Sequence, residues 1–302
     1  MRRPRLLVAA VAVLGAAPAL PATAQAPAAT DIYVLALTLR GGQVELGRPR
    51  NVTARVGYDN QPTFTPDGAQ LLYTSARDGQ ADSYAYDLAS GRTVRLTTTA
   101  VSEYSPTVTP DGAAISVVVV EPDSTQRLWR FPRGGGAAAL VLRDVRPVGY
   151  HAWADSSTLV LFVLGSGGTP ATLQVADVRT GRAEVVASAP HRSLQRMADG
   201  RVSVVLRDAD STRWLAAVDA RTRRIERLVR APDGGGEYDH AWLPDGSALM
   251  AGGGPVYRWA PGTSTWTRVA TFPASLRTPT RLAVSPRGDW LAVVAEEPGG
   301  TP

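Results

Sequence analysis

One short turn sequence recurs along the chain and limits what the chain can fold into. The segments NQPTFTPDG (60–68) and YSPTVTPDG (104–112) share the frame P-T-x-T-P-D-G. In such a turn Pro presets φ at the first corner, Asp can bond back to the chain, and Gly supplies the positive φ that closes a hairpin. Copies recur every 42–46 residues, as Pro66-Asp67-Gly68, Pro110-Asp111-Gly112, Ala154-Asp155-Ser156, Ala198-Asp199-Gly200, Pro244-Asp245-Gly246 and Pro286-Arg287-Gly288. Each copy therefore predicts a hairpin between two antiparallel strands.

The segments around these turns predict further strands. Apolar or β-branched runs such as 71–75 and 115–120 follow the turns, as is typical of strands. A third strand with aromatic residues at period two, such as Tyr84 and Tyr86, comes next, and then a Gly-containing turn and a short fourth strand. Four short strands in about 44 residues are typical of a β-propeller blade.

The two ends of the repeat region complement each other. The sixth turn is followed by the strand segment 290–294, and that last unit has only its first two strands. The segment 31–37 resembles a third strand, and 51–53 matches the fourth-strand segment 95–97. A pair of β-sandwiches does not explain these complementary half-units. The sequence thus predicts an all-β fold, a six-bladed β-propeller with four-stranded antiparallel blades, whose last blade is closed by amino-terminal strands.

The amino-terminal residues predict export. A basic start (Met1–Arg5), an apolar stretch (6–20) and small residues up to Ala26 are typical of a secretory signal peptide, cleaved after Ala24 or Ala26. We therefore expect a signal peptide at 1–26 and one propeller domain at 27–302, in the periplasm or the medium. The chain has no cysteine, which excludes disulfides and thiolate metal sites. No run is long and apolar enough to span a membrane.

Charge argues against nucleic acid as a partner. The net charge is +5 and every basic residue is Arg, but these residues are scattered among acidic ones. A nucleic-acid surface would instead show a basic stripe. We expect a monomer.

The segment QPTFTPDGAQLLYTSARDGQADSYAYDLASGRTVRLT (61–97) resembles the propeller repeat of the TolB family of WD40-like periplasmic proteins. The resemblance covers about 31–297. It implies a propeller whose channel mouth binds an envelope protein, as TolB binds a peptidoglycan-associated lipoprotein. TolB also carries an amino-terminal α/β domain, which we expect this chain to lack. The related propellers of prolyl peptidases precede a hydrolase domain, which is also not expected here.

Candidate site residues come from aligning the repeats. No nucleophile elbow, H-E-x-x-H, P-loop or dinucleotide motif occurs, so no catalytic residue is predicted. The HAW segments at 151–153 and 240–242 align with the start of innermost strands, which line the channel of a propeller. A second set of polar residues occupies one repeat position, eight residues before the middle residue of the turn. The predicted mouth residues are Asp59, Glu103, Tyr104, Tyr150, His151, His191, Glu237, Asp239 and His240. They could bind a cation, a sugar or a basic peptide, or merely hydrogen-bond neighbouring blades. Trp153 and Trp242 are expected in blade-to-blade packing.

Three functions remain open at this point. The leading hypothesis is an exported, non-catalytic TolB-like propeller that binds a protein, peptide or envelope glycan at its channel mouth, with no cofactor. The alternative is a metal-dependent propeller enzyme of the lactonase or carbohydrate lyase type. A third is a repeat scaffold whose specificity lies in its outer loops.

Overall fold

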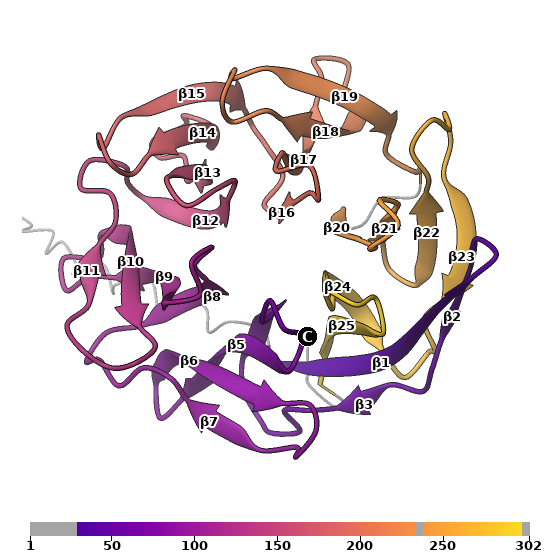
Figure 1. Ribbon diagram of the computed structural model, residues 1–302, viewed down its shortest axis with the longest axis horizontal. Helices are drawn as coiled ribbons and strands as arrows, with labels where there is room; N and C mark the ends of the chain where they lie inside the picture. The colour runs from indigo at the N-terminus through magenta and orange to yellow at the C-terminus, as the bar shows by residue number, and fades with distance from the viewer. Residues whose placement is uncertain (1–28, 234–237, 298–302) are drawn as a thin grey trace, which may run out of the picture.

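The computed structural model describes residues 29–233 and 238–297 of the 302-residue chain. Their regular elements are all strands, and these form six sheets around a central channel (Figure 1). The prediction of an all-β, six-bladed propeller is therefore confirmed. The described ranges contain no helix with the length and hydropathy that a membrane span requires. The predicted signal peptide, at 1–26, lies outside the described residues and stays a prediction.

Five blades are built from consecutive strands, so that each hairpin turn directly joins two neighbours. In each of the five, the first strand in sequence is innermost and pairs with the second, the second with the third and the third with the fourth. The strands are β4 (Asp59–Phe64), β5 (Gln70–Arg77), β6 (Gln80–Asp87) and β7 (Thr93–Arg95); β8 (Glu103–Val108), β9 (Ala114–Val120), β10 (Gln126–Pro132) and β11 (Ala139–Leu140); β12 (Val148–Trp153), β13 (Thr158–Val163), β14 (Thr172–Asp177) and β15 (Ala183–Ser188); β16 (Leu194–Arg196), β17 (Val202–Arg207), β18 (Arg213–Val218) and β19 (Ile225–Arg230); and β20 (Asp239–Trp242), β21 (Ala248–Ala251), β22 (Pro255–Trp259) and β23 (Thr267–Thr271). We number these blades 1 to 5.

Blade 6 joins the two ends of the chain. Its inner strands are β24 (Arg277–Val284) and β25 (Trp290–Glu296), and β1 (Thr30–Arg40) pairs antiparallel with β25, with Ile32 opposite Val294. The predicted closure by amino-terminal strands is thus confirmed. The outer strand is split into β2 (Gln43–Leu46) and β3 (Arg50–Asn51), which pair with opposite ends of β1. The two outer segments leave no long unpaired edge on β1.

The apolar core is divided among the interfaces between blades. Six clusters of buried apolar side chains occur, and each takes its members from two neighbouring blades. One of them, for example, packs Ile32 and Val34 of blade 6 against Leu71 and Tyr73 of blade 1. Since every blade buries both faces against neighbours, the ring is stable only when all six sheets are in place.

The recurring turn owes its geometry to its own residues. Thr65 donates its hydroxyl hydrogen to Asp67 Oδ1 at 2.5 Å, and the same oxygen accepts the N–H of Ala69 at 3.0 Å. Gly68 has φ of 71°, and Gly112 has φ of 70° in the equivalent turn. The turn of blade 3 differs, because Ser156 is not among the described residues with positive φ. The loss of Gly there goes with a different backbone path.

The positive φ of these turn glycines leads to a prediction about stability. Replacing Gly112 by Val should lower the free energy of unfolding by roughly 1–3 kcal/mol, because a β-branched residue is strained at positive φ. An added Cβ at Gly112 meets no atom within 4 Å, so the loss reports backbone strain alone. Urea unfolding measures the change. Ser156→Val is the matched control and should cost far less; equal losses would contradict a turn geometry that depends on positive φ.

Candidate functional site

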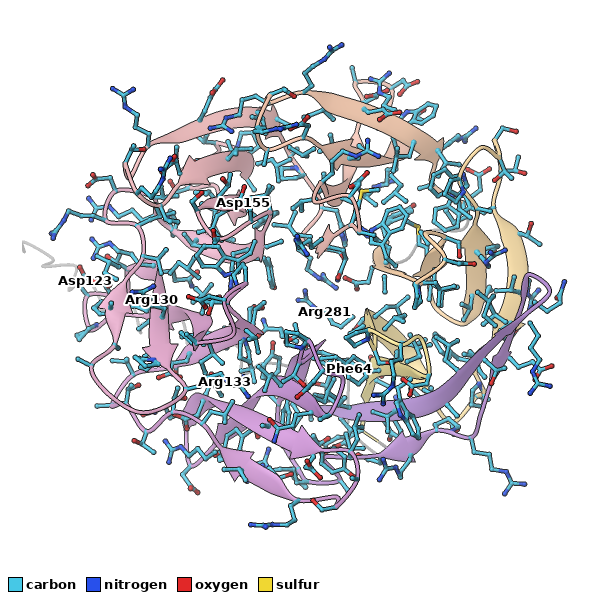
Figure 2. The ribbon with its side chains drawn as sticks, in the orientation of Figure 1. Phe64, Asp123, Arg130, Arg133, Asp155 and Arg281 are labelled. Carbon is cyan, nitrogen blue, oxygen red and sulfur yellow. The ribbon has the colours of Figure 1, made fainter. Side chains whose placement is uncertain are left out.

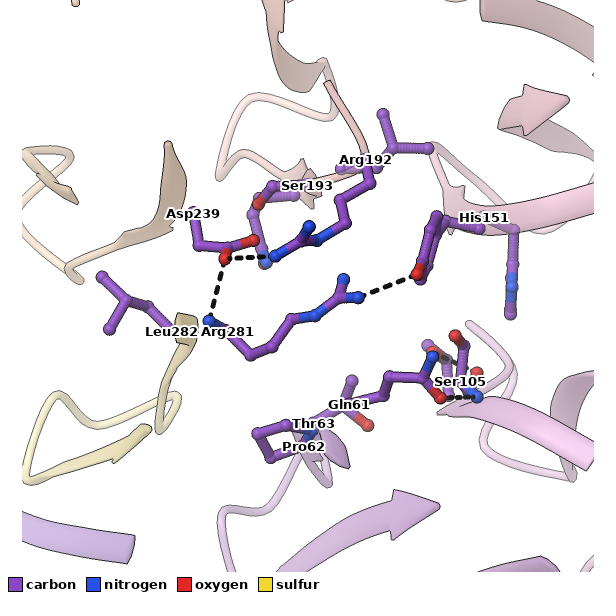
Figure 3. A pocket seen from close by; sticks show the side chains of 14 residues that line it. Gln61, Pro62, Thr63, Ser105, His151, Arg192, Ser193, Asp239, Arg281 and Leu282 are labelled. Atoms are coloured by element: carbon purple, nitrogen blue, oxygen red, sulfur yellow. Dashed lines mark hydrogen bonds and ion pairs between the residues drawn. The ribbon is translucent and has the colours of Figure 1, made fainter. Parts of the chain in front are cut away.

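Each blade contributes one residue at an equivalent repeat position to the lining of a cavity in the channel. Five of these residues lie six positions before the middle residue of the turn, and blade 3 is one residue shorter there. They meet around a cavity of about 80 Å³ (Figure 3). We call them the channel ring: Gln61, Ser105, Tyr150, Ser193, Asp239 and Arg281.

Strained backbone aims three members of the channel ring at the cavity. Gln61, Ser105 and Arg281 have φ of 58°, 57° and 57°, which non-glycine residues rarely adopt. Each lies at a break in the pairing register of the innermost strand, in β4, β8 and β24. Bulges of this kind re-aim side chains and recur beside functional sites. Because the same distortion occurs at one repeat position in three blades, we infer that it belongs to the architecture of the channel and is not a local irregularity of one blade.

Arg281 crosses the channel. It comes from blade 6 (Figure 2), and its Nη2 donates to the hydroxyl of Tyr150 in blade 3, on the opposite side of the ring, at 2.8 Å. Its Cζ lies 4.8 Å from the centre of the Tyr150 ring, a cation–π contact. The backbone N–H of Arg281 donates to Asp239 Oδ2 at 3.0 Å. Arg281 is therefore held at both ends of the residue, its backbone by Asp239 and its guanidinium by Tyr150.

A second Arg pairs with the carboxylate of the cavity. Arg192 Nη2 lies 3.2 Å from Asp239 Oδ2, and Asp239 is 2% exposed. The charged side chains among the described lining residues are thus Arg192, Asp239 and Arg281. One carboxylate faces two guanidinium groups, so these side chains carry a net positive charge.

Tyrosines surround the same end of the channel. The rings of Tyr58 and Tyr104 meet edge to face with centroids 6.5 Å apart. Burial raises the pKa of Tyr58, and the positive charges of Arg281 and Arg192 act against this rise. We call Tyr58, Tyr104, Tyr150, Arg192 and Arg281 the entry mouth. It offers aromatic faces, hydroxyl groups and positive charge.

Comparison with known proteins identifies the fold. No family model matches the sequence, and no curated protein matches it. Solved structures do match: a protein designated TolB from Agrobacterium tumefaciens has a TM-score of 0.62 at 16% identity, covering 90% of this chain and 99% of that one. TolB from Acinetobacter baumannii has a TM-score of 0.58 at 16% identity, and the match covers 90% of this chain and 64% of that one. This chain has the TolB-like propeller fold.

An enzyme shares the architecture. The oligogalacturonate lyase of Vibrio parahaemolyticus has a TM-score of 0.52 at 14% identity, with 91% of this chain and all of that one covered. At such identities the TolB-like fold is shared and the chemistry is not thereby transferred. The site itself must decide the function.

Three predicted residues of the TolB-like propeller line the cavity. Tyr150 and Asp239 belong to the channel ring, and His151 lies beside them. Tyr104 lies in the entry mouth against Tyr58. His191 lies against the ring of Tyr238, with centroids 6.1 Å apart. Glu237 lies outside the described residues.

The structure places Asp59 and Glu103 inside their blades. Both are 0% exposed, and neither is among the lining residues of the cavity. Asp59 pairs with Arg55 at 3.4 Å, and Glu103 accepts the hydroxyl hydrogen of Thr99 at 2.6 Å. Burial raises the pKa of both carboxyl groups, which these partners partly offset. These are the contacts of structural groups, and Glu103 also accepts from the hydroxyl of Ser83 in blade 1 at 3.4 Å, which links two blades.

The two HAW segments form the same inter-blade contact. His151 Nε2 lies 2.8 Å from Ser116 Oγ of blade 2, and Trp153 donates its indole N–H to that oxygen at 2.9 Å. Blade 5 repeats this with His240, Trp242 and Ser203 of blade 4, at 2.7 Å each. We call each set a His–Ser–Trp staple. The expectation that the two Trp residues pack between blades is confirmed.

The hydrogen positions in the staples depend on the histidine tautomer. Each Ser hydroxyl has a backbone carbonyl at 3.2 Å, that of Thr107 in one case and that of Gln195 in the other. When the hydroxyl donates to that carbonyl, its oxygen accepts from both Trp and His, and the His then carries its hydrogen on Nε2. Burial lowers the pKa of both His151 and His240 to about 4, which keeps them neutral at pH 7. These imidazoles stabilise blade interfaces.

The described residues offer little for a metal ion. Within 29–233 and 238–297, no three His, Asp or Glu side chains lie close enough together to hold one. The Nε2 atoms of the two aligned His residues already bond Ser hydroxyls. A functional site in this region would rest on Arg281, Arg192 and Gln61. The sequence did not predict these residues, because the repeats were aligned on acidic residues and histidines. The column six residues before the turn is the sequence signal that finds Arg281 and Gln61.

Proposed function

We propose that this chain is an exported, non-catalytic binding protein, in the periplasm or the medium, that takes a protein, peptide or envelope glycan at the entry mouth. The observation that carries the proposal is the channel ring, in which six side chains from six blades converge on one cavity. Convergence of polar groups in a concavity is the usual mark of a binding site. No motif for covalent catalysis accompanies it in the sequence.

The composition of the entry mouth supports binding of a macromolecule. Tyr and Arg are the residues most enriched at protein-binding hot spots, because they combine large contact areas with polar groups. The cavity of the channel ring, of about 80 Å³, is below the size of a pocket that encloses a whole small ligand, and it shares lining residues with a second channel cavity of about 470 Å³. A partner that lies over the mouth can therefore insert a group into the channel.

Site-specific photo-crosslinking tests the proposal. Benzoylphenylalanine in place of Tyr104, at the entry mouth, should crosslink a specific envelope component when the protein is irradiated in an envelope extract. The expected product is suppressed by excess unmodified protein, and mass spectrometry identifies it. The same amino acid in place of Val185, an exposed residue of the outer strand β15, is the matched control. Equal products from both positions, or from Val185 alone, would place binding on the outer loops instead.

A further inference from the structure

The guanidinium of Arg281 has hydrogen-bond donors to spare. A guanidinium carries five N–H donors, and in the described residues only the hydroxyl of Tyr150 accepts from it. No described carboxylate lies within 4.0 Å of its nitrogen atoms, since Asp239 pairs with Arg192 and accepts only the backbone N–H of Arg281. A charged group in a confined cavity is costly unless acceptors satisfy it. An acceptor from outside the chain would complete this site.

Two residues with hydroxyl groups that could donate line the same cavity. Tyr150 uses its oxygen to accept from Arg281, which leaves its own hydrogen available. Ser105 Oγ is buried and has no hydrogen-bond partner, although it belongs to the channel ring. A buried hydroxyl without a partner calls for an explanation, and an absent ligand is one. Figure 3 shows Ser105 and Arg281 on the same cavity.

The guanidinium of Arg281 and the two hydroxyls are donors that match the needs of a carboxylate, while the Asp239 carboxylate of the same ring is paired with Arg192. A guanidinium fork binds carboxylate oxygens with charge-assisted hydrogen bonds, and a carboxylate accepts on both oxygens. The positive charge of the Arg281 guanidinium favours an anion. The strained φ of Arg281 holds this side chain in the channel before any ligand arrives, which reduces the cost of ordering it.

We propose that the channel ring binds a carboxylate group of a peptide partner, through the guanidinium of Arg281 and the hydroxyls of Tyr150 and Ser105. This proposal rests on the proposed function and specifies the chemical group that the entry mouth recognises. The carboxylate belongs to an acidic side chain or to a peptide carboxyl terminus. In both cases it is attached through a narrow, flexible part of the peptide. A uronic acid carries its carboxyl group directly on a sugar ring, which is a poorer fit to a cavity of about 80 Å³.

Peptide libraries provide the test. The probes are fluorescent random pentapeptides in four forms, with a free or an amidated carboxyl terminus and with Glu or Gln at a fixed internal position. Fluorescence anisotropy measures binding to the full chain. We expect the wild type to bind at least one carboxylate form more tightly than its amide counterpart. Arg281→Gln should weaken that binding about 10- to 100-fold, as for the loss of a charged hydrogen bond, and remove the preference over the amide.

Two further variants keep the result interpretable. Tyr150→Phe retains the aromatic ring but loses the hydroxyl, and should weaken carboxylate binding several-fold even if Arg281→Gln fails to fold. Arg133→Gln removes an exposed Arg of blade 2 and should leave affinity unchanged (Figure 2). An Arg281→Gln protein with a lower melting temperature but wild-type affinity would show that Arg281 only plugs the channel, and would overturn the proposal.

Other outcomes would overturn it as well. These are wild-type protein that binds no carboxylate probe, equal affinity for acids and amides, or selective binding of oligouronates over peptides. If crosslinking at Tyr104 still captures a partner in such a case, the proposed function stands and only its carboxylate chemistry fails.

Discussion

Deleting residues 27–55 is expected to abolish the folded monomer. The deletion removes β1, β2 and β3, and from β1 alone five nearly fully buried apolar side chains, Ile32, Tyr33, Val34, Leu35 and Leu37. Burial of five such side chains contributes on the order of 10 kcal/mol. This equals the whole free energy of unfolding of an ordinary domain, about 5–15 kcal/mol. The deletion also exposes the edge of β25, which invites aggregation.

Size-exclusion chromatography and thermal unfolding measure this loss. A variant that begins at Ala29 is the matched control, because it keeps every strand of blade 6, and it should remain a monomer with the wild-type melting temperature. A deletion protein that stays monomeric and melts like the wild type would show that β1 is dispensable for the ring.

Acid should destabilise the protein through the two His–Ser–Trp staples. The pKa of His151 and of His240 is about 4 in the folded chain, against an unfolded value of 6.5. The unfolded state therefore binds more protons than the folded state as the pH falls from about 6.5 to 4. Stability is lost across this window, by about 3 kcal/mol for each imidazole. Urea unfolding at pH 7.5 and pH 4.5 measures the difference.

Substitution of the imidazoles isolates their share. His151→Gln with His240→Gln should be less stable at pH 7.5, yet should lose much less stability than the wild type on acidification. Asp59 and Glu103, whose raised pKa values act in the opposite direction, are present in both proteins and cancel in the comparison. An unchanged dependence on pH would mean that other groups control acid unfolding.

The fold was predictable because its signals are local. The P-D-G turn specifies a hairpin through the φ preferences of Pro and Gly and the hydrogen bonds of Asp67, all within five residues. Six copies at equal spacing then leave few architectures other than a ring. The split of the outer strand of blade 6 into β2 and β3 was not predictable from the fourth-strand match alone, because it depends on how the chain turns at Gly47, whose N–H bonds Ala36 O at 2.8 Å.

The site was only partly predictable, because β-bulges in the innermost strands change which residues face the channel. Strict alternation would place Asp59 on the same side of β4 as Gln61 and Thr63. The register break between Asn60 and Thr63 inserts one extra residue, so the residues before it face the other way. The same break in β8 turns Glu103 into its blade. Arg281 was missed because its role depends on Tyr150, three blades away, which no local pattern connects to it.

The closure of blade 6 also bears on the order of folding. The pairing of β1 with β25 joins residues at nearly the largest sequence separation that the described chain allows. Contacts of high sequence separation form slowly, because the chain must lose entropy before they contribute. Blades 1 to 5 can each assemble from one contiguous segment, whereas β1 pairs with a strand that follows all five of them in sequence. We therefore expect an open arc of sheets to form before β1 and β25 meet and complete the ring.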